Sequence, residues 1–280
     1  MIRLDGKEVS KALRKTLAQS VEKTKRPPGL GVILVGEDPA SQVYVRNKMK
    51  ACSEVGMESV EIQLPSSASE DELITAIAAM NENPGVDAYL IQLPLPKKFN
   101  EQEMIGRIDP KKDADGLTVE NLGLLMAGRP RSVPCTPNGV MQILKFYDID
   151  VVGKNVVVIG RSQIVGKPMA QLLLAANATV TVCHSKTENL FEHTQRAEIV
   201  VVAAGQPKFL KKEAFKKGAV VIDVGMHRLP SGKLCGDVDP EGLENWVSAL
   251  TPVPGGVGPM TITMLLQNTL SLYQASESAT

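Results

Sequence analysis

Two side chains that could take part in a reaction, Tyr44 and Lys48, lie four residues apart on a segment with helical apolar spacing. Residues i and i+4 are neighbours on a helix surface, and this pair lies beside an apolar stripe of Val45, Met49 and Cys52. Both could therefore face a cleft at the edge of the core, where desolvation lowers the pKa of a lysine and lets it transfer protons. The alternative is a lysine stem that covers the helix surface beside a half-buried tyrosine.

A third polar residue, Gln92, follows a predicted buried strand at 86–91 that is stopped by Pro94 and Pro96. Ligands of open α/β sheets bind at the carboxyl ends of the strands. Gln92 is therefore a candidate site residue, unless its amide only bonds to the neighbouring loop backbone.

Two carboxylates, Asp113 and Asp115, lie two residues apart in the polar turn KDADG. Such a pair could bind a metal, hold the amino group of a ligand, or form an Asx-turn. No other Asp, Glu or His nearby completes a metal-ligand spacing, so we predict no metal site.

The stretch Val156–Met169, VVVIGRSQIVGKPM, has the pattern of a buried strand, a phosphate-binding turn and a helix start. The G-x-G-x-x-G fingerprint is not met, because Ser162 replaces the middle glycine after Gly160 and Gly166 comes one residue late. A strand at 155–159, a helix at 166–177 and a second strand at 178–183 nevertheless complete a βαβ unit. We therefore expect a dinucleotide at this turn.

The end of the second strand indicates which dinucleotide binds. An NAD-selective site usually has Asp or Glu there for the ribose hydroxyl, whereas this chain has His184, Ser185 and Lys186. These side chains and Arg161 could bind a ribose phosphate, which favours NADP. The alternative is a polar loop with a surface lysine.

Composition narrows the class of protein. The chain has 280 residues with 31 basic and 31 acidic side chains, which argues against nucleic acid as the main partner. Neither a signal peptide nor a membrane-spanning apolar run is present, so no membrane partner is expected. Single scattered thiols indicate a reduced, cytoplasmic protein; they are Cys52, Cys135, Cys183 and Cys235.

The repeated order of strand and helix predicts an α/β protein with mostly parallel sheets. We expect an N-terminal α/β catalytic domain at 1–140 and a Rossmann-type NADP-binding domain at 141–260, with the active site in the cleft between them. The proline- and glycine-rich track at 251–260 could let a ligand ring approach the backbone of Pro254, Gly255 and Gly256 closely. Alternatively, the track is a shaped linker into a last helix at 261–273.

Together these motifs resemble the bifunctional methylenetetrahydrofolate dehydrogenase/cyclohydrolase family over nearly the whole chain. The resemblance is carried by YVRNK at 44–48, QLPL at 92–95, KDADG at 112–116, PCTP at 134–137, GRSQIVGKP at 160–168, HSKT at 184–187 and PGGVGPMT at 254–261. It implies NADP-dependent oxidation of 5,10-methylenetetrahydrofolate to the methenyl form, followed by hydrolysis to 10-formyltetrahydrofolate.

The resemblance also implies roles for individual residues. Lys48 would be the acid/base group, Gln92 would hydrogen-bond and tune it, Tyr44 would position the folate, and Asp115 would hold the amino edge of the pterin. Near the nucleotide phosphates it places Arg161, Ser162 and Ser185. Family members are commonly homodimers, and residues 261–280 would pack back onto the first domain.

Three alternatives stay open at this point. The chain could be a dehydrogenase-only folate enzyme, or another two-domain NADP dehydrogenase that resembles shikimate dehydrogenase. It could also be a non-catalytic nucleotide sensor, which would give Tyr44, Lys48, Gln92 and Asp115 no reason to converge.

Overall fold

The computed structural model describes residues 1–278 and consists of two compact units. Unit 1 combines Met1–Lys11 with Thr136–Thr261, and unit 2 combines Ala12–Cys135 with the C-terminal segment from Ile262. The first eleven residues thus group differently from the expected domain at 1–140. The reason is that β1 (Ile2–Arg3) pairs in parallel with β11 (Ala249–Leu250) and so adds a strand to the sheet of unit 1.

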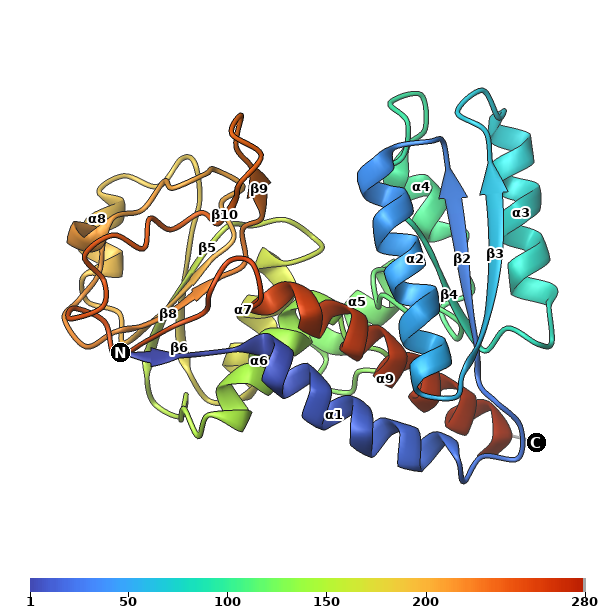
Figure 1. Ribbon diagram of the computed structural model, residues 1–280, viewed down its shortest axis with the longest axis horizontal. Coiled ribbons are helices and arrows are strands. Elements are labelled where there is room, and N and C mark those ends of the chain that lie inside the picture. Colours follow the sequence, from blue (N-terminus) through green and yellow to red (C-terminus); the bar gives the residue numbers. More distant parts are fainter. Residues whose placement is uncertain (279–280) are drawn as a thin grey trace. The chain divides into compact units, whose positions relative to one another are not determined.

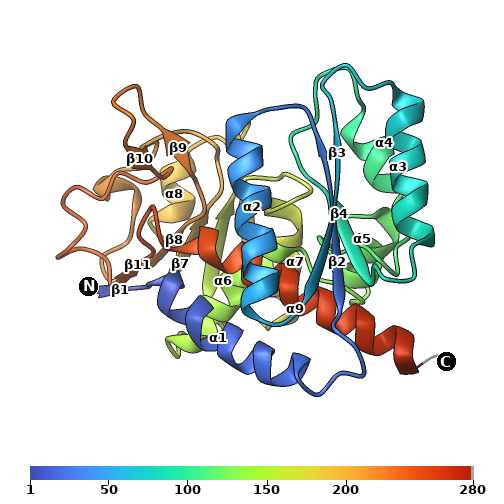
Figure 2. The same cartoon turned by 45° about the vertical axis from the view of Figure 1, so that its right-hand side comes forward.

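Unit 2 is built on a three-stranded parallel sheet in the order β3-β2-β4, formed by β2 (Gly29–Val35), β3 (Glu58–Leu64) and β4 (Ala88–Ile91). Its helices are α2 (Pro39–Glu54), α3 (Glu70–Glu82), α4 (Glu101–Gly106) and α5 (Val119–Met126), with the larger parts of α1 (Gly6–Val21) and α9 (Val257–Ser278). Helices α2 and α3 cover opposite faces of this sheet (Figure 1, Figure 2). The face below α3 and α4 holds a continuous apolar core that includes Ile33, Ile77, Tyr89 and Met104.

Local sequence signals account for the ends of α2 and α3. The Asp38 carboxylate accepts a hydrogen bond from the Ser41 backbone N–H at 2.8 Å, and Gly56 follows the helix at φ +81°. Ser69 and Glu72 form the reciprocal capping box that the sequence predicts. The two caps fix where α2 and α3 begin. The start of α2 in turn determines which of its side chains face the sheet.

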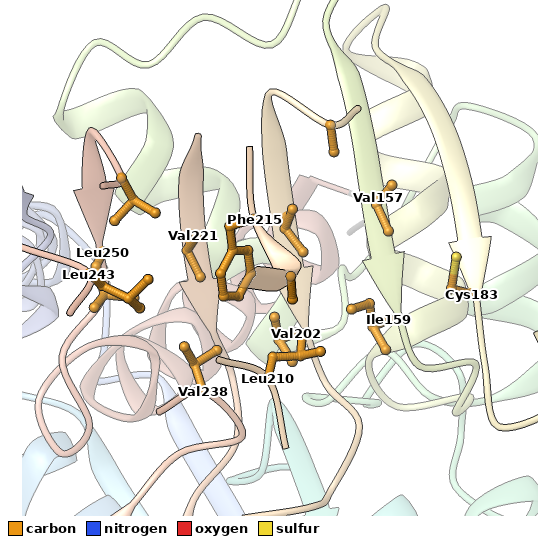
Figure 3. Close-up of a cluster of buried hydrophobic side chains, with 14 residues drawn as sticks. Val157, Ile159, Cys183, Val202, Leu210, Phe215, Val221, Val238, Leu243 and Leu250 are labelled. Atoms are coloured by element: carbon orange, nitrogen blue, oxygen red, sulfur yellow. The ribbon is translucent and has the colours of Figure 1, made fainter. Parts of the chain in front are cut away.

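Unit 1 contains a six-stranded, wholly parallel sheet in the order β1-β11-β8-β7-β5-β6. Its remaining strands are β5 (Asn155–Ile159), β6 (Thr179–Cys183), β7 (Ile199–Val202) and β8 (Val220–Asp223), with a separate antiparallel pair, β9 (His227–Arg228) and β10 (Leu234–Cys235). Helices α6 (Cys135–Phe146), α7 (Gly166–Ala175) and α8 (Leu190–Thr194) and a 3-10 turn (Lys212–Ala214) complete it. Figure 3 shows the buried cluster on one face of the sheet, where Phe215 and Leu210 pack against Val202 and Val221.

The last helix begins earlier than expected, at Val257 instead of residue 261. Pro259 does not prevent this, because proline is tolerated in the first helical turn, where backbone N–H groups have no partner in the helix. The second half of the proline- and glycine-rich track is therefore helical.

A partly buried ion pair that the sequence did not indicate fastens the N-terminal edge of the unit 2 sheet. The Arg26 guanidinium donates to both oxygens of the Asp87 carboxylate at 2.8 and 2.7 Å, and its carbon lies 5.0 Å from the ring centre of Tyr273. Asp87 also accepts from the Gly29 backbone N–H at 2.7 Å. The pair thus joins β2, β4 and α9.

We predict that Arg26→Met destabilises the protein by about 2 kcal/mol or more, because it leaves the Asp87 carboxylate largely buried without its cation. Denaturant unfolding measures the change. The neighbouring Lys25→Met is the control, because Lys25 is 83% exposed and pairs with Glu277 at the surface, so this variant should unfold like the wild type. Equal stabilities for all three proteins would contradict the prediction.

Candidate functional site

Lys48 is buried in unit 2, with only 8% of its surface exposed. It lies on the same buried side of α2 as Val45 and Cys52. Its Nζ donates to Gln92 Oε1 at 3.0 Å, and Gln92 Nε2 donates to the Leu93 carbonyl at 2.6 Å. The surface-lysine alternative is therefore wrong, and Gln92 binds both the lysine and its own loop.

Burial lowers the pKa of the Lys48 ammonium, because a low-dielectric environment disfavours the charged form. The negative charge of Asp115 opposes this effect, and so, to a smaller extent, do Cys135 and Cys52. The neutral amine is therefore populated at lower pH than in an ordinary lysine. Such an amine can accept and return protons, which is what general acid–base catalysis requires.

The two carboxylates of the KDADG turn have different environments. Asp113 is buried and saturated: Oδ1 accepts from the Gly116 N–H at 2.9 Å, and Oδ2 accepts from the Thr118 N–H at 2.8 Å and from Asn121 Nδ2 at 2.9 Å. Asp113 thus forms the structural turn that was one of the three alternatives. Asp115 remains available for a ligand.

Asp115 belongs to the same group of side chains as Lys48. Burial raises the pKa of its carboxyl, whereas the Lys48 charge and a hydrogen bond from Cys135 lower it. Burial likewise raises the pKa of the Cys135 thiol, so this cysteine stays protonated. Burial thus favours the neutral forms of Lys48 and Asp115, whereas the attraction between their charges favours the ionised forms. A ligand that excludes water or adds charge therefore shifts the pKa values of both groups.

Tyr44 lies one helical turn before Lys48 on α2 and is 40% exposed. Unit 2 therefore contains all four expected catalytic residues, and three of them, Lys48, Gln92 and Asp115, interact. Among the described residues, no group of three or more His, Cys, Asp or Glu side chains could hold a metal ion.

In unit 1, the turn after β5 explains the displaced glycine. Gly160 has φ +126°, and a Cβ there would collide with the carbonyl of Ala203, the residue that follows the neighbouring strand β7. A Cβ on Gly166 would collide with the backbone of Gly160 and Arg161. Gly166 therefore serves the close helix–strand packing that the last glycine of the fingerprint normally permits.

Ser162 has a structural role in this turn. Its Oγ accepts from the backbone N–H groups of Val165 and Gly166 at 3.2 and 3.4 Å, where α7 begins. These amides are the groups that a helix N-terminus offers to an anion. Arg161 and Ser162 are exposed at the turn, so an anion could reach both.

The loop after β6 is a short turn without an acidic side chain at 184–187. The His184 backbone N–H donates to Thr187 Oγ1 at 2.8 Å, and His184 Nδ1 accepts from the Lys186 N–H at 3.2 Å. Ser185 and Lys186 are exposed. Strands β5 and β6 pair in parallel from Asn155–Thr179 to Ile159–Cys183, so the two loops lie at one edge of the sheet.

The residues at 254–256 have structural explanations that involve no ligand. Gly255 has φ +109°, and Gly256 packs against Gly6 so closely that a Cβ on Gly6 would meet the Gly256 carbonyl. Pro254 is exposed and follows a cis peptide bond. All three belong to unit 1, whereas Lys48 belongs to unit 2.

Unit 1 contains a polar cluster around Asp237 that the sequence did not indicate. The buried Asp237 carboxylate accepts from the backbone N–H groups of Ala204, Gly205 and Gln206 at 2.6, 3.0 and 2.9 Å, and lies 2.6 Å from His227 Nε2. It orders the loop after β7. No spacing pattern marked it, because its partners are backbone groups.

Comparisons with known proteins match both units. A family model described as tetrahydrofolate dehydrogenase/cyclohydrolase, catalytic domain, matches residues 4–115, and its NAD(P)-binding counterpart matches residues 134–277. The chain is 56% identical over 276 residues to the bifunctional protein FolD of Bdellovibrio bacteriovorus, which covers 97% of this chain and 96% of that one.

Solved structures agree with this match. The bifunctional FolD enzyme of Campylobacter jejuni superposes with a TM-score of 0.94 at 45% identity, covering 98% of this chain and 99% of that one. The methylenetetrahydrofolate dehydrogenase-cyclohydrolase of Trypanosoma brucei, complexed with NADP cofactor and inhibitor, gives a TM-score of 0.93 at 38% identity, covering 99% and 98%.

We predict that Gly166→Ala weakens dinucleotide binding about tenfold or more, because the new methyl group must displace the backbone of the phosphate-binding turn. Fluorescence titration with NADPH measures the affinity. Gly123→Ala is the control, because a Cβ on this helical glycine of α5 meets nothing within 4 Å. Wild-type affinity in a folded Gly166→Ala variant would contradict this prediction.

Proposed function

We infer that the chain, which belongs to the tetrahydrofolate dehydrogenase/cyclohydrolase family, is a bifunctional one-carbon folate enzyme. It oxidises 5,10-methylenetetrahydrofolate to the methenyl form with NADP and hydrolyses that product to 10-formyltetrahydrofolate. The observation that carries this function is the buried Lys48 amine, hydrogen-bonded to Gln92 and influenced electrostatically by Asp115.

The two units divide the work in this proposal. Unit 2 holds the folate, since it contains the expected acid/base group and the polar residues around it. Unit 1 holds NADP on the turn after β5 and the loop after β6. Relative to the division expected from sequence, residues 1–11 fall in unit 1 instead of the first domain, and unit 1 also takes residues 136–140 and residue 261.

In the dehydrogenase reaction, NADP supplies a nicotinamide ring that accepts hydride. The residues that would hold the dinucleotide are Gly160, Ser162 and Gly166 at the turn, with Arg161, His184 and Ser185 around the ribose phosphate. They fit this group, because the turn with its exposed Arg161 and Ser162 lies at the N-terminus of α7, and residues 184–187 include no acid to repel a phosphate. A folate ring would approach Pro254, Gly255 and Gly256.

In the hydrolase reaction, Lys48 accepts a proton as water adds to the methenyl carbon. The protonated Lys48 then returns a proton to N5 as the bond between that carbon and N5 breaks. The remaining hydroxyl proton passes to solvent water as the formyl carbonyl forms, so the cationic methenyl species and water give the neutral formyl product and one proton. Gln92 keeps the amine in place through its Oε1, Asp115 accepts from the pterin amino edge, and Tyr44 positions the ring.

The alternatives differ in what they leave unexplained. A dehydrogenase-only enzyme needs no proton-transferring lysine, yet Lys48 is held in a site that lowers its pKa. A nucleotide sensor gives no reason for Lys48, Gln92 and Asp115 to interact. Family membership removes the shikimate-dehydrogenase-like alternative.

We further propose that the protein is a cytoplasmic homodimer. All four cysteines are buried and unpaired, which supports a reducing compartment. None of the described helices is long and apolar enough to span a bilayer. Light scattering of the purified protein tests the dimer.

We predict that Lys48→Met lowers cyclohydrolase turnover about 100-fold or more, because it removes the acid/base group, while folding and NADP binding persist. A coupled assay with 5,10-methylenetetrahydrofolate follows NADPH formation and loss of the methenyl species together. Lys50→Met is the control, because Lys50 lies on the exposed face of α2. Normal hydrolysis by Lys48→Met would refute the assignment.

For the cofactor, we predict a much higher kcat/KM with NADP than with NAD, because the ribose phosphate meets Arg161 and Ser185 instead of an acid. The double variant Arg161→Ala/Ser185→Ala should lose most of this preference by raising the KM for NADP alone. Lys167→Ala, on the exposed start of α7, serves as the control. Similar kcat/KM values for the two cofactors in the wild type would refute the charge argument.

A further inference from the structure

Helix α9 carries a buried polar side chain, Asn268, that the reaction scheme does not use. Asn268 is 5% exposed, and its Nδ2 donates to the carbonyls of Ala114 and Val133, each at 2.8 Å. The Cys135 Sγ lies 3.6 Å from the same nitrogen. One amide group thus joins two separate segments of unit 2 to its last helix.

Both segments carry side chains of the site. The Ala114 carbonyl belongs to the peptide bond that leads into Asp115, and Val133 lies two residues before Cys135. The Cys135 Sγ in turn donates to the Ala114 carbonyl at 3.5 Å and hydrogen-bonds to Asp115. Asn268 therefore holds the backbone of the two residues that set the polarity around Lys48.

The opposite side of the same turn is already fixed. The Ala114 N–H donates to the Tyr89 carbonyl of β4 at 3.1 Å, and Asp113 anchors the following residues through its three hydrogen bonds. Ala114 is thus held by its N–H to the sheet and by its C=O to α9. Without the bond from Asn268, the Ala114 carbonyl keeps only the weak hydrogen bond from the Cys135 thiol, so the orientation of the peptide group that precedes Asp115 is less constrained.

We propose that Asn268 is a positioning residue for the folate site: by fixing the Ala114 and Val133 carbonyls it places Asp115 for the pterin amino edge and at a defined separation from Lys48. This inference rests on the proposed function, because it needs a folate at Asp115. It assigns to the C-terminal helix a part in substrate binding and proton transfer, although Asn268 touches neither substrate nor cofactor.

A purely structural role for Asn268 would give different experimental results from a positioning role. Losing its two hydrogen bonds leaves the Val133 carbonyl without this donor and the Ala114 carbonyl with only the Cys135 thiol, which lowers stability in either case. Only a positioning role also changes the KM for folate and the pH dependence of hydrolysis. The direction follows from charge: Asp115 raises the pKa of Lys48, so a displaced Asp115 moves the pH–rate limb of Lys48 to lower pH.

The test uses Asn268→Leu, which keeps the branched shape of the side chain without its polar atoms, and Asn268→Ser, which keeps one donor and leaves room for water. The control is Thr269→Val, because Thr269 is buried one residue later on α9 and bonds only within the helix, to the Leu265 carbonyl at 2.9 Å. Thermal unfolding, KM for methylenetetrahydrofolate, KM for NADP and the pH profile of cyclohydrolase turnover are measured for each.

We expect the Asn268 variants to raise the folate KM about fivefold or more, equivalent to ~1 kcal/mol of lost binding, with the KM for NADP within about twofold of wild type. In their pH profiles of cyclohydrolase turnover, the limb that reports the ionisation of Lys48 should move to lower pH. Thr269→Val should lose stability without either change. Folded Asn268 variants with wild-type folate KM and pH profile would overturn the inference, as would failure of both variants to fold. An inactive wild-type enzyme would instead overturn the proposed function.

Discussion

The site depends on one interaction, the hydrogen bond from the buried Lys48 amine to Gln92 Oε1. A lysine charge removed from water is costly unless it is paired or neutralised. Here the neighbouring acceptor is a neutral amide, and the carboxylate that favours the charge, Asp115, has its own pKa raised by burial. Burial therefore lowers the pKa of Lys48 and shifts the amine towards its neutral form, which is the state that can take a proton from water.

The scaffold holds this amine between three rigid elements of unit 2. The side chain of Asp38 caps the N-terminus of α2, which begins at Pro39 and carries Lys48 on its buried side. Strand β4 delivers Gln92, whose backbone N–H still pairs with the Ile33 carbonyl of β2 at 2.8 Å. Helix α9 reaches the Asp115 segment through Asn268. A site supported by helices and strands keeps its geometry better than one built on loops.

Local signals predicted the elements well, because caps, apolar periodicity and turn residues act over a few positions. The capping box at Ser69 and the strand at 155–159 are examples. The pairing of β1 with β11 and the bond between Asn268 and Ala114 join residues more than a hundred positions apart, and no short pattern encodes such contacts. The burial of Lys48 was likewise undecided, since spacing places a residue beside a stripe without saying what covers it.

Burial should make Lys48 lose its proton at a lower pH than an ordinary lysine does. The most direct test is NMR of protein labelled with ¹³C at lysine Cε, with the Lys48 signal identified by its absence in Lys48→Met. We expect Lys48 to lose its proton at a pH below the ordinary lysine pKa of about 10.4, because burial disfavours its charged form. Loss of the Lys48 proton at or above that pKa would contradict this expectation.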